Sequence, residues 1–130
     1  MYNDFQIYER TVQLIGEEAF EKLQQTRVLL FGAGGVGGWC AEALIRTGIG
    51  KLSIVDFDTV APSNLNRQLV ATQDTLGKPK AEALANAALS FSDRVKSSRA
   101  LVLYSLCVSS SKSEMWLSAI ARYAEPMTAL

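Results

Sequence analysis

Residues 27–58 read RVLLFGAGGVGGWCAEALIRTGIGKLSIVDFD, and their pattern decides the fold. The apolar run Val28–Phe31 ends at a glycine-rich turn, and residues 36–47 after the turn have helical character. A second apolar run, Leu52–Val55, ends on Asp56. Strand, glycine turn, helix and second strand in this order are typical of a βαβ unit that binds a mononucleotide. We therefore expect an α/β, Rossmann-like fold with a parallel sheet flanked by helices.

The turn and the acidic residues after the second strand are the first candidate ligand contacts. Glycines let the backbone turn sharply and approach a phosphate, and the helix that follows offers N–H groups and a positive dipole end. The glycines concerned are Gly32, Gly34, Gly35 and Gly37. Asp56 lies about 20 residues further on, where a carboxylate accepts hydrogen bonds from ribose hydroxyls. Asp58 points to the same side while the chain is extended, and it fits a ligand contact and a turn-initiating residue equally well.

The segments around this unit give further structural expectations. Because Val28–Phe31 is continuously apolar, we expect a central strand that is covered on both faces. The helix should end at Gly48 and carry an outward ion pair between Glu42 and Arg46. Its spacing places four residues on one face, namely Val36, Cys40, Ala43 and Thr47. Before the first strand, apolar positions at helical spacing predict two short helices separated at Gly16.

Composition limits the class of protein. A chain of 130 residues fits one domain but is short for a complete nucleotide-dependent enzyme with its own substrate site. Thirteen acidic and thirteen basic residues give a net charge of zero, so no bulk attraction to nucleic acid or to a membrane is expected. The absence of histidine excludes a Ser-His triad, and two distant cysteines indicate neither a zinc site nor a disulfide framework. Without an apolar signal core, a cytoplasmic location is expected.

The loop after Asp58 is rich in amide and cationic groups. It contains the sequence SNLNRQ at residues 63–68 and GKPK at residues 77–80, where Pro79 opens a further helix over residues 81–89. The loop leaves from the carboxyl end of a parallel strand, the edge at which open α/β sheets bind ligands. Arg67 and Lys80 therefore have the position to meet a polyphosphate, although each alone also fits an exposed surface charge.

The four motifs GAGGVG, VDFD, SNLNRQ and GKPK, in this order and spacing, resemble the adenylating domain of the ubiquitin-activating-enzyme-like family, which includes ThiF, MoeB and HesA. The resemblance covers residues 5–89. Residues 17–58 are most similar to the bacterial tRNA threonylcarbamoyladenosine dehydratase branch (TcdA) of that family.

The resemblance implies ATP-dependent adenylation, in which a carboxylate attacks the α-phosphate of ATP and pyrophosphate leaves. In the dehydratase branch the carboxylate belongs to the threonylcarbamoyl group on a tRNA adenosine, which then cyclises with loss of water. By resemblance, the glycine turn and Asp56 bind the nucleotide and its ribose. Arg10 reaches into the ATP site of the partner in a homodimer. The phosphate-side residues match Ser63, Asn64, Arg67 and Lys80, so the residues assigned to catalysis are Arg10, Arg67 and Lys80.

Beyond residue 89 the resemblance ends. The segment 90–130 carries ten serines between positions 90 and 118, and it is treated as a divergent tail after a first unit at 1–89. We expect a strand within residues 100–108, with Cys107 as an apolar core residue, and a helix over residues 113–124. The family implies Mg²⁺, but the downstream aspartate that binds it is absent here, so no metal ligand is assigned. This shift in composition also suits a truncated or frameshifted gene product.

Two alternatives to an adenylating enzyme remain open from the sequence. A dinucleotide-dependent oxidoreductase explains the glycines and Asp56 but gives Arg67 and Lys80 no task. A non-catalytic nucleotide-binding or dimerisation remnant fits the missing second half of the family pattern. Expected partners are a second copy of the chain and tRNA, with a sulfur-carrier or ubiquitin-like protein as the alternative to tRNA and no membrane.

Overall fold

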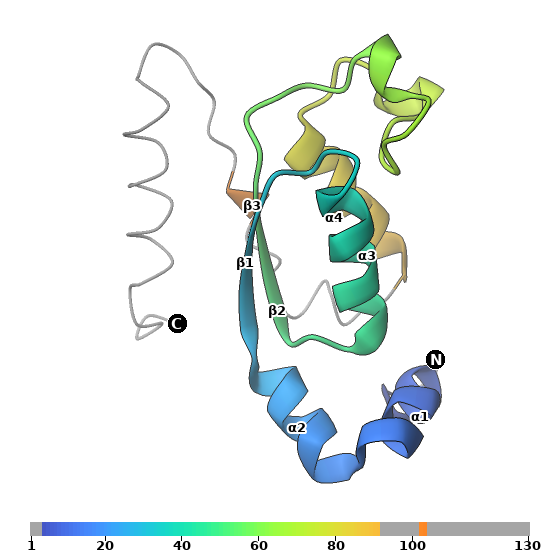
Figure 1. Cartoon of the computed structure of the whole chain (residues 1–130), viewed down its shortest axis with the longest axis vertical. Helices are drawn as coiled ribbons and strands as arrows, with labels where there is room; N and C mark the ends of the chain where they lie inside the picture. Colours follow the sequence, from blue (N-terminus) through green and yellow to red (C-terminus); the bar gives the residue numbers. More distant parts are fainter. Residues whose placement is uncertain (1–3, 92–101, 104–130) are drawn as a thin grey trace.

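The computed structural model describes residues 4–91 and 102–103 (Figure 1). The elements follow in the order α1 (Asp4–Ile15), α2 (Glu17–Gln25), β1 (Arg27–Phe31), α3 (Gly37–Thr47), β2 (Lys51–Val55), η1 (Pro62–Asn64), η2 (Gln73–Thr75), α4 (Lys80–Phe91) and β3 (Val102–Leu103), where η1 and η2 are short 3-10 helices. The predicted α/β architecture with a helical lead-in is confirmed. None of the described helices has the length and apolar character needed to cross a bilayer.

The sheet is parallel, with strand order β1-β2-β3. Strands β1 and β2 are paired along their whole length, from Arg27 opposite Lys51 to Phe31 opposite Val55. Helix α3 connects them, so the predicted βαβ unit is confirmed. The two residues of β3 fall inside the strand expected at 100–108. Cys107 and the helix expected at 113–124 lie outside the described residues.

Within the described sheet, β1 does not have the central position that the sequence predicted. In the described part of the chain β1 pairs with a single strand, and Phe31 is 39% exposed. The central strand is β2 instead, with Ile54 and Val55 each 1% exposed. The physical reason is position: β2 has a neighbouring strand on each side, whereas β1 lies at the edge of the described sheet. A continuous apolar run alone therefore did not identify the central strand of the described sheet.

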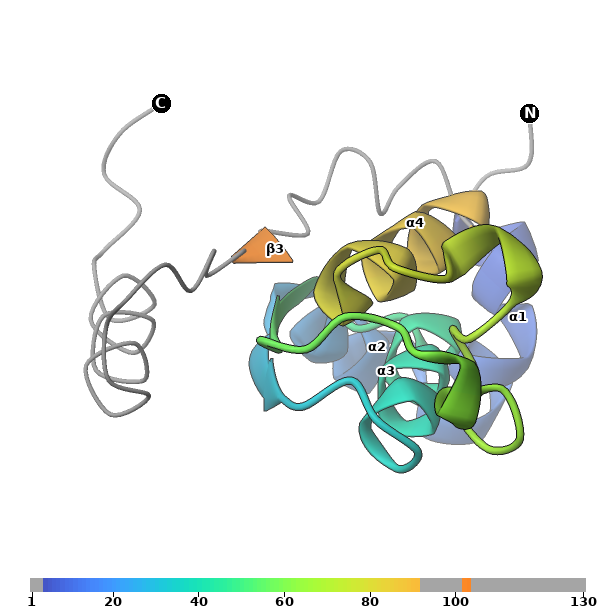
Figure 2. The same cartoon turned by 90° about the horizontal axis from the view of Figure 1, so that it is seen from above.

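Helices α3 and α4 lie side by side on one face of the sheet (Figures 1 and 2). The ion pair between Glu42 and Arg46 is confirmed, at 2.5 Å between Oε1 and Nε. However, the face of α3 that carries Val36, Cys40, Ala43 and Thr47 is exposed. The buried face carries small residues and one large one, Gly38, Ala41 and Ile45. Short side chains allow the helix to lie close to its neighbours, so they are buried in preference to the larger apolar positions.

The two lead-in helices pack against the end of α3. Gly16 separates α1 from α2 with a φ of 83°, as the sequence predicted. The rings of Tyr8 and Phe20 lie 5.4 Å apart, and the Tyr8 hydroxyl donates to the Ile45 carbonyl at 3.4 Å. Gly48 ends α3 in the left-handed conformation with a φ of 98°, which is the predicted C-terminal stop. Figure 1 shows α1 and α2 at one end of the sheet and the glycine turn with the loop 59–79 at the other.

Candidate functional site

The glycine turn joins β1 to α3 at the carboxyl end of the sheet (Figure 1). The Gly32 amide donates to the Val55 carbonyl of β2 at 2.8 Å, and Gly32 has a φ of 91°, which disfavours any other residue. A Cβ placed on Gly37 would lie 1.8 Å from the Gly32 carbonyl oxygen. The turn is therefore closed so tightly on itself that position 37 admits no side chain.

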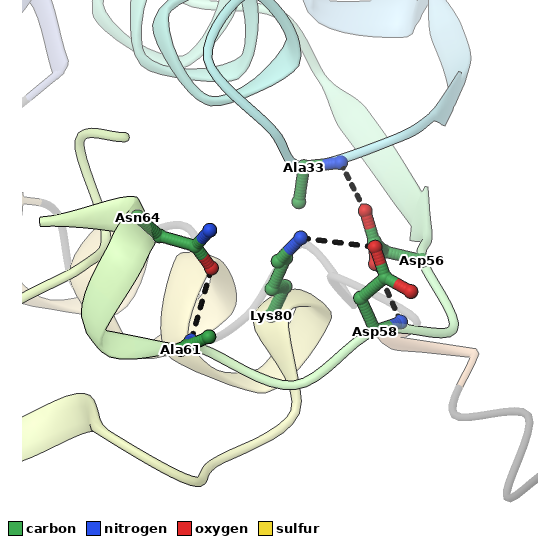
Figure 3. A network of polar contacts seen from close by, with 6 residues as sticks. All are labelled: Ala33, Asp56, Asp58, Ala61, Asn64 and Lys80. Carbon is green, nitrogen blue, oxygen red and sulfur yellow. Dashed lines mark hydrogen bonds and ion pairs between the residues drawn. The ribbon is translucent and has the colours of Figure 1, made fainter. Parts of the chain in front are cut away.

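Asp56 connects the end of β2 to this turn (Figure 3). Its Oδ2 accepts a hydrogen bond from the Ala33 amide at 2.6 Å, and its Oδ1 accepts one from the Asp58 amide at 2.8 Å. A carboxylate oxygen has more than one acceptor position, so each oxygen can accept a further hydrogen bond from a hydroxyl group. The structure thus places the predicted ribose-binding acid directly against the predicted phosphate-binding turn.

The SNLNRQ loop lies against the other side of the turn. The Cβ position of Gly35 is 3.9 Å from the Arg67 Cγ. Arg67 is exposed, and its Nη1 donates to the Ser63 carbonyl at 2.8 Å and to the Asn66 Oδ1 at 2.9 Å. Asn64 is 7% exposed, and its Oδ1 accepts from the Ala61 amide at 3.0 Å. Ser63 is exposed beside it. Asn64 therefore shapes the start of η1, while Arg67 is an exposed residue next to the turn.

Lys80 is the buried cation of the site. Its side chain is 8% exposed, and its Nζ lies 3.0 Å from Asp58 Oδ2, whose side chain is 71% exposed. Figure 3 shows the Lys80 ammonium directed toward the side of the site where Ala33, Asp56 and Asp58 lie. An ammonium group that is buried at the carboxyl edge of a sheet is suited to bind an anion.

Gln68 is a residue of this region that the sequence analysis did not select. It is 8% exposed, and its Nε2 lies 4.0 Å from the Cβ position of Gly34. Its buried Oε1 has no hydrogen-bond partner among the residues that the structure describes. A buried oxygen without a partner is uncommon, because its desolvation is not compensated. The available signal was its place in the SNLNRQ motif, directly after Arg67.

Arg10 lies apart from the other candidates. It is exposed on α1, where its Nη1 donates to Gln13 Oε1 at 3.4 Å. Because α1 is at the opposite end of the sheet from the glycine turn, Arg10 does not join the site of its own chain (Figure 1). The predicted contact with a nucleotide would require a second copy of the chain.

The described residues do not form a metal site. Nowhere within residues 4–91 and 102–103 do three or more His, Cys, Asp or Glu side chains gather in an arrangement that could hold an ion. Asp56 accepts two backbone amides and Asp58 pairs with Lys80, which leaves no carboxylate cluster.

The chain is similar in sequence to proteins of one family. The model of the ThiF family matches residues 8–121. The tRNA threonylcarbamoyladenosine dehydratase of Escherichia coli (strain K12) is 45% identical over 75 residues, which are 58% of this chain and 28% of that protein. The molybdopterin-synthase adenylyltransferase of the same strain is 42% identical over 82 residues, covering 63% of this chain and 32% of that protein. This chain thus spans less than a third of the length of either relative.

Solved structures show the same likeness. The crystal structure of E. coli tRNA N6-threonylcarbamoyladenosine dehydratase, TcdA, in complex with ATP superposes with a TM-score of 0.68 at 38% identity. The similarity covers 72% of this chain and 40% of that one. A second structure of the same enzyme, in complex with AMP, gives the same TM-score and identity. The resemblance inferred from the four motifs is confirmed.

Proposed function

Because the chain belongs to the ThiF family, we propose that it binds ATP at the carboxyl edge of its sheet and adenylates a carboxylate. The observation that carries this proposal is the contact between the Asp56 carboxylate and the Ala33 amide. It brings together the acid that we propose for the ribose and the turn that we propose for the phosphates, as one nucleotide site requires. The similar TcdA structures hold ATP or AMP, which supports this choice of nucleotide.

We assign roles by the chemistry of each group. The turn glycines, Gly32, Gly34, Gly35 and Gly37, let the backbone approach the phosphates, and Asp56 accepts hydrogen bonds from the ribose hydroxyls. Asn64 and Ser63 hold the loop from which Arg67 reaches the phosphates. Lys80 approaches the phosphates from the start of α4.

The reaction follows from these positions. An oxygen of the substrate carboxylate attacks the α-phosphorus of ATP, a new P–O bond forms, and the bond to the bridging oxygen breaks to release pyrophosphate. Negative charge gathers on the α-phosphate and on the leaving group, and Arg67 and Lys80 offset it. Catalysis then depends on positioning and charge, which fits a chain without histidine. Mg²⁺, which the family implies, has no ligand set among the described residues, and no step here depends on it.

For the substrate we propose the threonylcarbamoyl group of a tRNA adenosine, because the dehydratases are among the relatives with the highest identity. Activation of that carboxylate allows a nucleophile of the same group to close a ring as AMP leaves, with net loss of water. A cytoplasmic location and a homodimer, in which Arg10 reaches the ATP of the partner, belong to the same proposal. Relatives named as SUMO-activating and molybdopterin-synthase enzymes support a ubiquitin-like or sulfur-carrier protein as the competing substrate class.

The test is exchange of radiolabelled pyrophosphate into ATP by the purified chain. We expect exchange that requires tRNA carrying threonylcarbamoyladenosine and that is absent with unmodified tRNA. Exchange that requires a carrier protein instead would contradict the tRNA assignment. Saturable binding of a fluorescent ATP analogue without exchange under any of these conditions would contradict adenylation and leave a nucleotide-binding module.

A further inference from the structure

Lys80 forms an ion pair with Asp58, a contact that the family role of Lys80 as a phosphate ligand does not require. The Lys80 side chain is 8% exposed, and its Nζ forms an ion pair with the Asp58 carboxylate at 3.0 Å. Burial of an ammonium without a counter-ion is costly, because the protein interior solvates charge poorly. Asp58 therefore supplies the negative charge that lets Lys80 occupy this position.

The backbone of Lys80 is held by other contacts. Residues 58–60 and 77–80 form a short antiparallel pairing, which we call the 58–80 clasp. Three backbone hydrogen bonds of 2.9 Å form it, from Lys80 to Asp58, from Val60 to Lys78 and from Gly77 to Val60. These bonds use main-chain atoms, so they remain when the Asp58 carboxylate is changed. The side-chain ion pair is consequently not needed to bring the start of α4 to the site.

The exposure of the two partners is unequal. Asp58 keeps 71% of its side chain accessible, whereas Lys80 is enclosed. An exposed carboxylate is well solvated after it separates from its partner, so it can give up the ammonium at small cost. A phosphate that enters the site can then take its place beside Lys80.

We propose that Asp58 is a placeholder counter-ion: it neutralises Lys80 in the empty site and is displaced from the ammonium when a phosphate binds. Asp58 is in this view a positioning residue that acts through Lys80 and makes no contact with the nucleotide. The proposal rests on the proposed function only in taking a phosphate as the entering anion. Its consequence is that Asp58 competes with the ligand, so its charge lowers the affinity for phosphates.

The decisive variant is Asp58→Asn, which keeps the shape and removes the charge. Dissociation constants are measured for inorganic tripolyphosphate, ATP and adenosine, with Asp74→Asn as the matched control because Asp74 is an exposed acid outside the site. We expect Asp58→Asn to bind tripolyphosphate and ATP about fourfold more tightly, which is the effect of removing one charge at about 5 Å in a water-like dielectric, and to bind adenosine unchanged. The gain should shrink in high salt.

Unchanged or weaker binding of tripolyphosphate by Asp58→Asn would overturn the proposal, as would the absence of saturable tripolyphosphate binding by the unaltered chain. A second readout needs no ligand. In urea denaturation, Asp58→Asn should lower the midpoint of the natural chain, because Lys80 loses its counter-ion. It should not lower the midpoint of a chain that already carries Lys80→Met. Equal lowering in both chains would refute the pairing. Asp58→Ser serves the same comparisons if the asparagine variant does not fold. If these binding and urea results are obtained but the chain catalyses no pyrophosphate exchange, the proposed adenylation is refuted and the role of Asp58 is not.

Discussion

Gly37→Ala tests whether the tight glycine turn is a requirement of the fold. The added methyl group would lie 1.8 Å from the Gly32 carbonyl oxygen, well inside the distance at which carbon and oxygen repel. Neither atom belongs to a flexible side chain, so the turn itself must open. Opening it displaces the Gly32 amide from Val55 at 2.8 Å and the Ala33 amide from Asp56 at 2.6 Å.

The cost can be estimated from those contacts. A neutral backbone hydrogen bond contributes about 1 kcal/mol and one to a charged acceptor about 2 kcal/mol, so loss of both costs about 3 kcal/mol. Overpacking of a filled site costs a similar amount, about 1 to 3 kcal/mol. With a urea dependence of about 2 kcal/mol per molar for a small domain, the denaturation midpoint should fall by about 1.5 M.

The matched control lies in the same turn. A Cβ on Gly34 meets no atom closer than Gln68 Nε2 at 4.0 Å, so Gly34→Ala should change the unfolding free energy by no more than about 0.5 kcal/mol. It should nevertheless weaken ATP binding, because the methyl group occupies the space proposed for a phosphate. Urea denaturation of both variants, followed by tryptophan fluorescence, separates the two effects. A Gly37→Ala midpoint equal to that of Gly34→Ala would refute the closed turn.

Three further substitutions test the assigned roles. In Asp56→Asn the amide side chain cannot accept hydrogen bonds from both backbone amides, so one donor loses its partner. The unfolding free energy should fall by about 2 kcal/mol in the same urea assay, and the affinities for ATP and adenosine should fall as well. Unchanged stability would contradict the bridging role of Asp56. Arg67→Ala and Lys80→Ala should each weaken ATP binding more than AMP binding in calorimetric titrations, and equal losses for the two nucleotides would exclude phosphate contacts. Arg10→Ala should weaken ATP binding only in a chain that sedimentation shows to be dimeric, and normal affinity in such a dimer would eliminate the cross-subunit contact.

The βαβ unit was predictable because its signals are local. The apolar runs, the glycines between them and the stop at Gly48 each act over a few residues, and the structure places β1, α3 and β2 within a residue of the expected bounds. The acid at the end of β2 was predictable for the same reason. Once two strands are parallel and adjacent, the turn after one and the residue after the other must meet at one edge of the sheet.

The buried face of α3 was not predictable from apolar spacing, because apolar residues occur around the whole helix. Val36 and Trp39 are 85% and 58% exposed, while Ala41 is fully buried. What decides the orientation is how closely the helix can approach its neighbours, and this favours the side with Gly38 and Ala41. Likewise, β2 is central in the described sheet because it pairs with β3, which lies more than 45 residues later in the chain. A local sequence pattern cannot predict such a distant pairing.

The ion pair between Asp58 and Lys80 could not be predicted from the motifs, because the motifs do not show which of their side chains contact each other. Both residues lie in family motifs; the resemblance implied a phosphate role for Lys80, and the sequence left Asp58 open between a ligand contact and a turn. In the structure the two motifs are joined by the 58–80 clasp, and the two side chains pair with each other. The ligand site therefore contains an internal competitor for its own cation. Asp56 is different, since its backbone donors at Ala33 and Asp58 leave its oxygens able to accept more. Of the two acids, one should increase nucleotide affinity and the other should reduce it, so charge-removing substitutions two positions apart should have opposite effects on ATP binding.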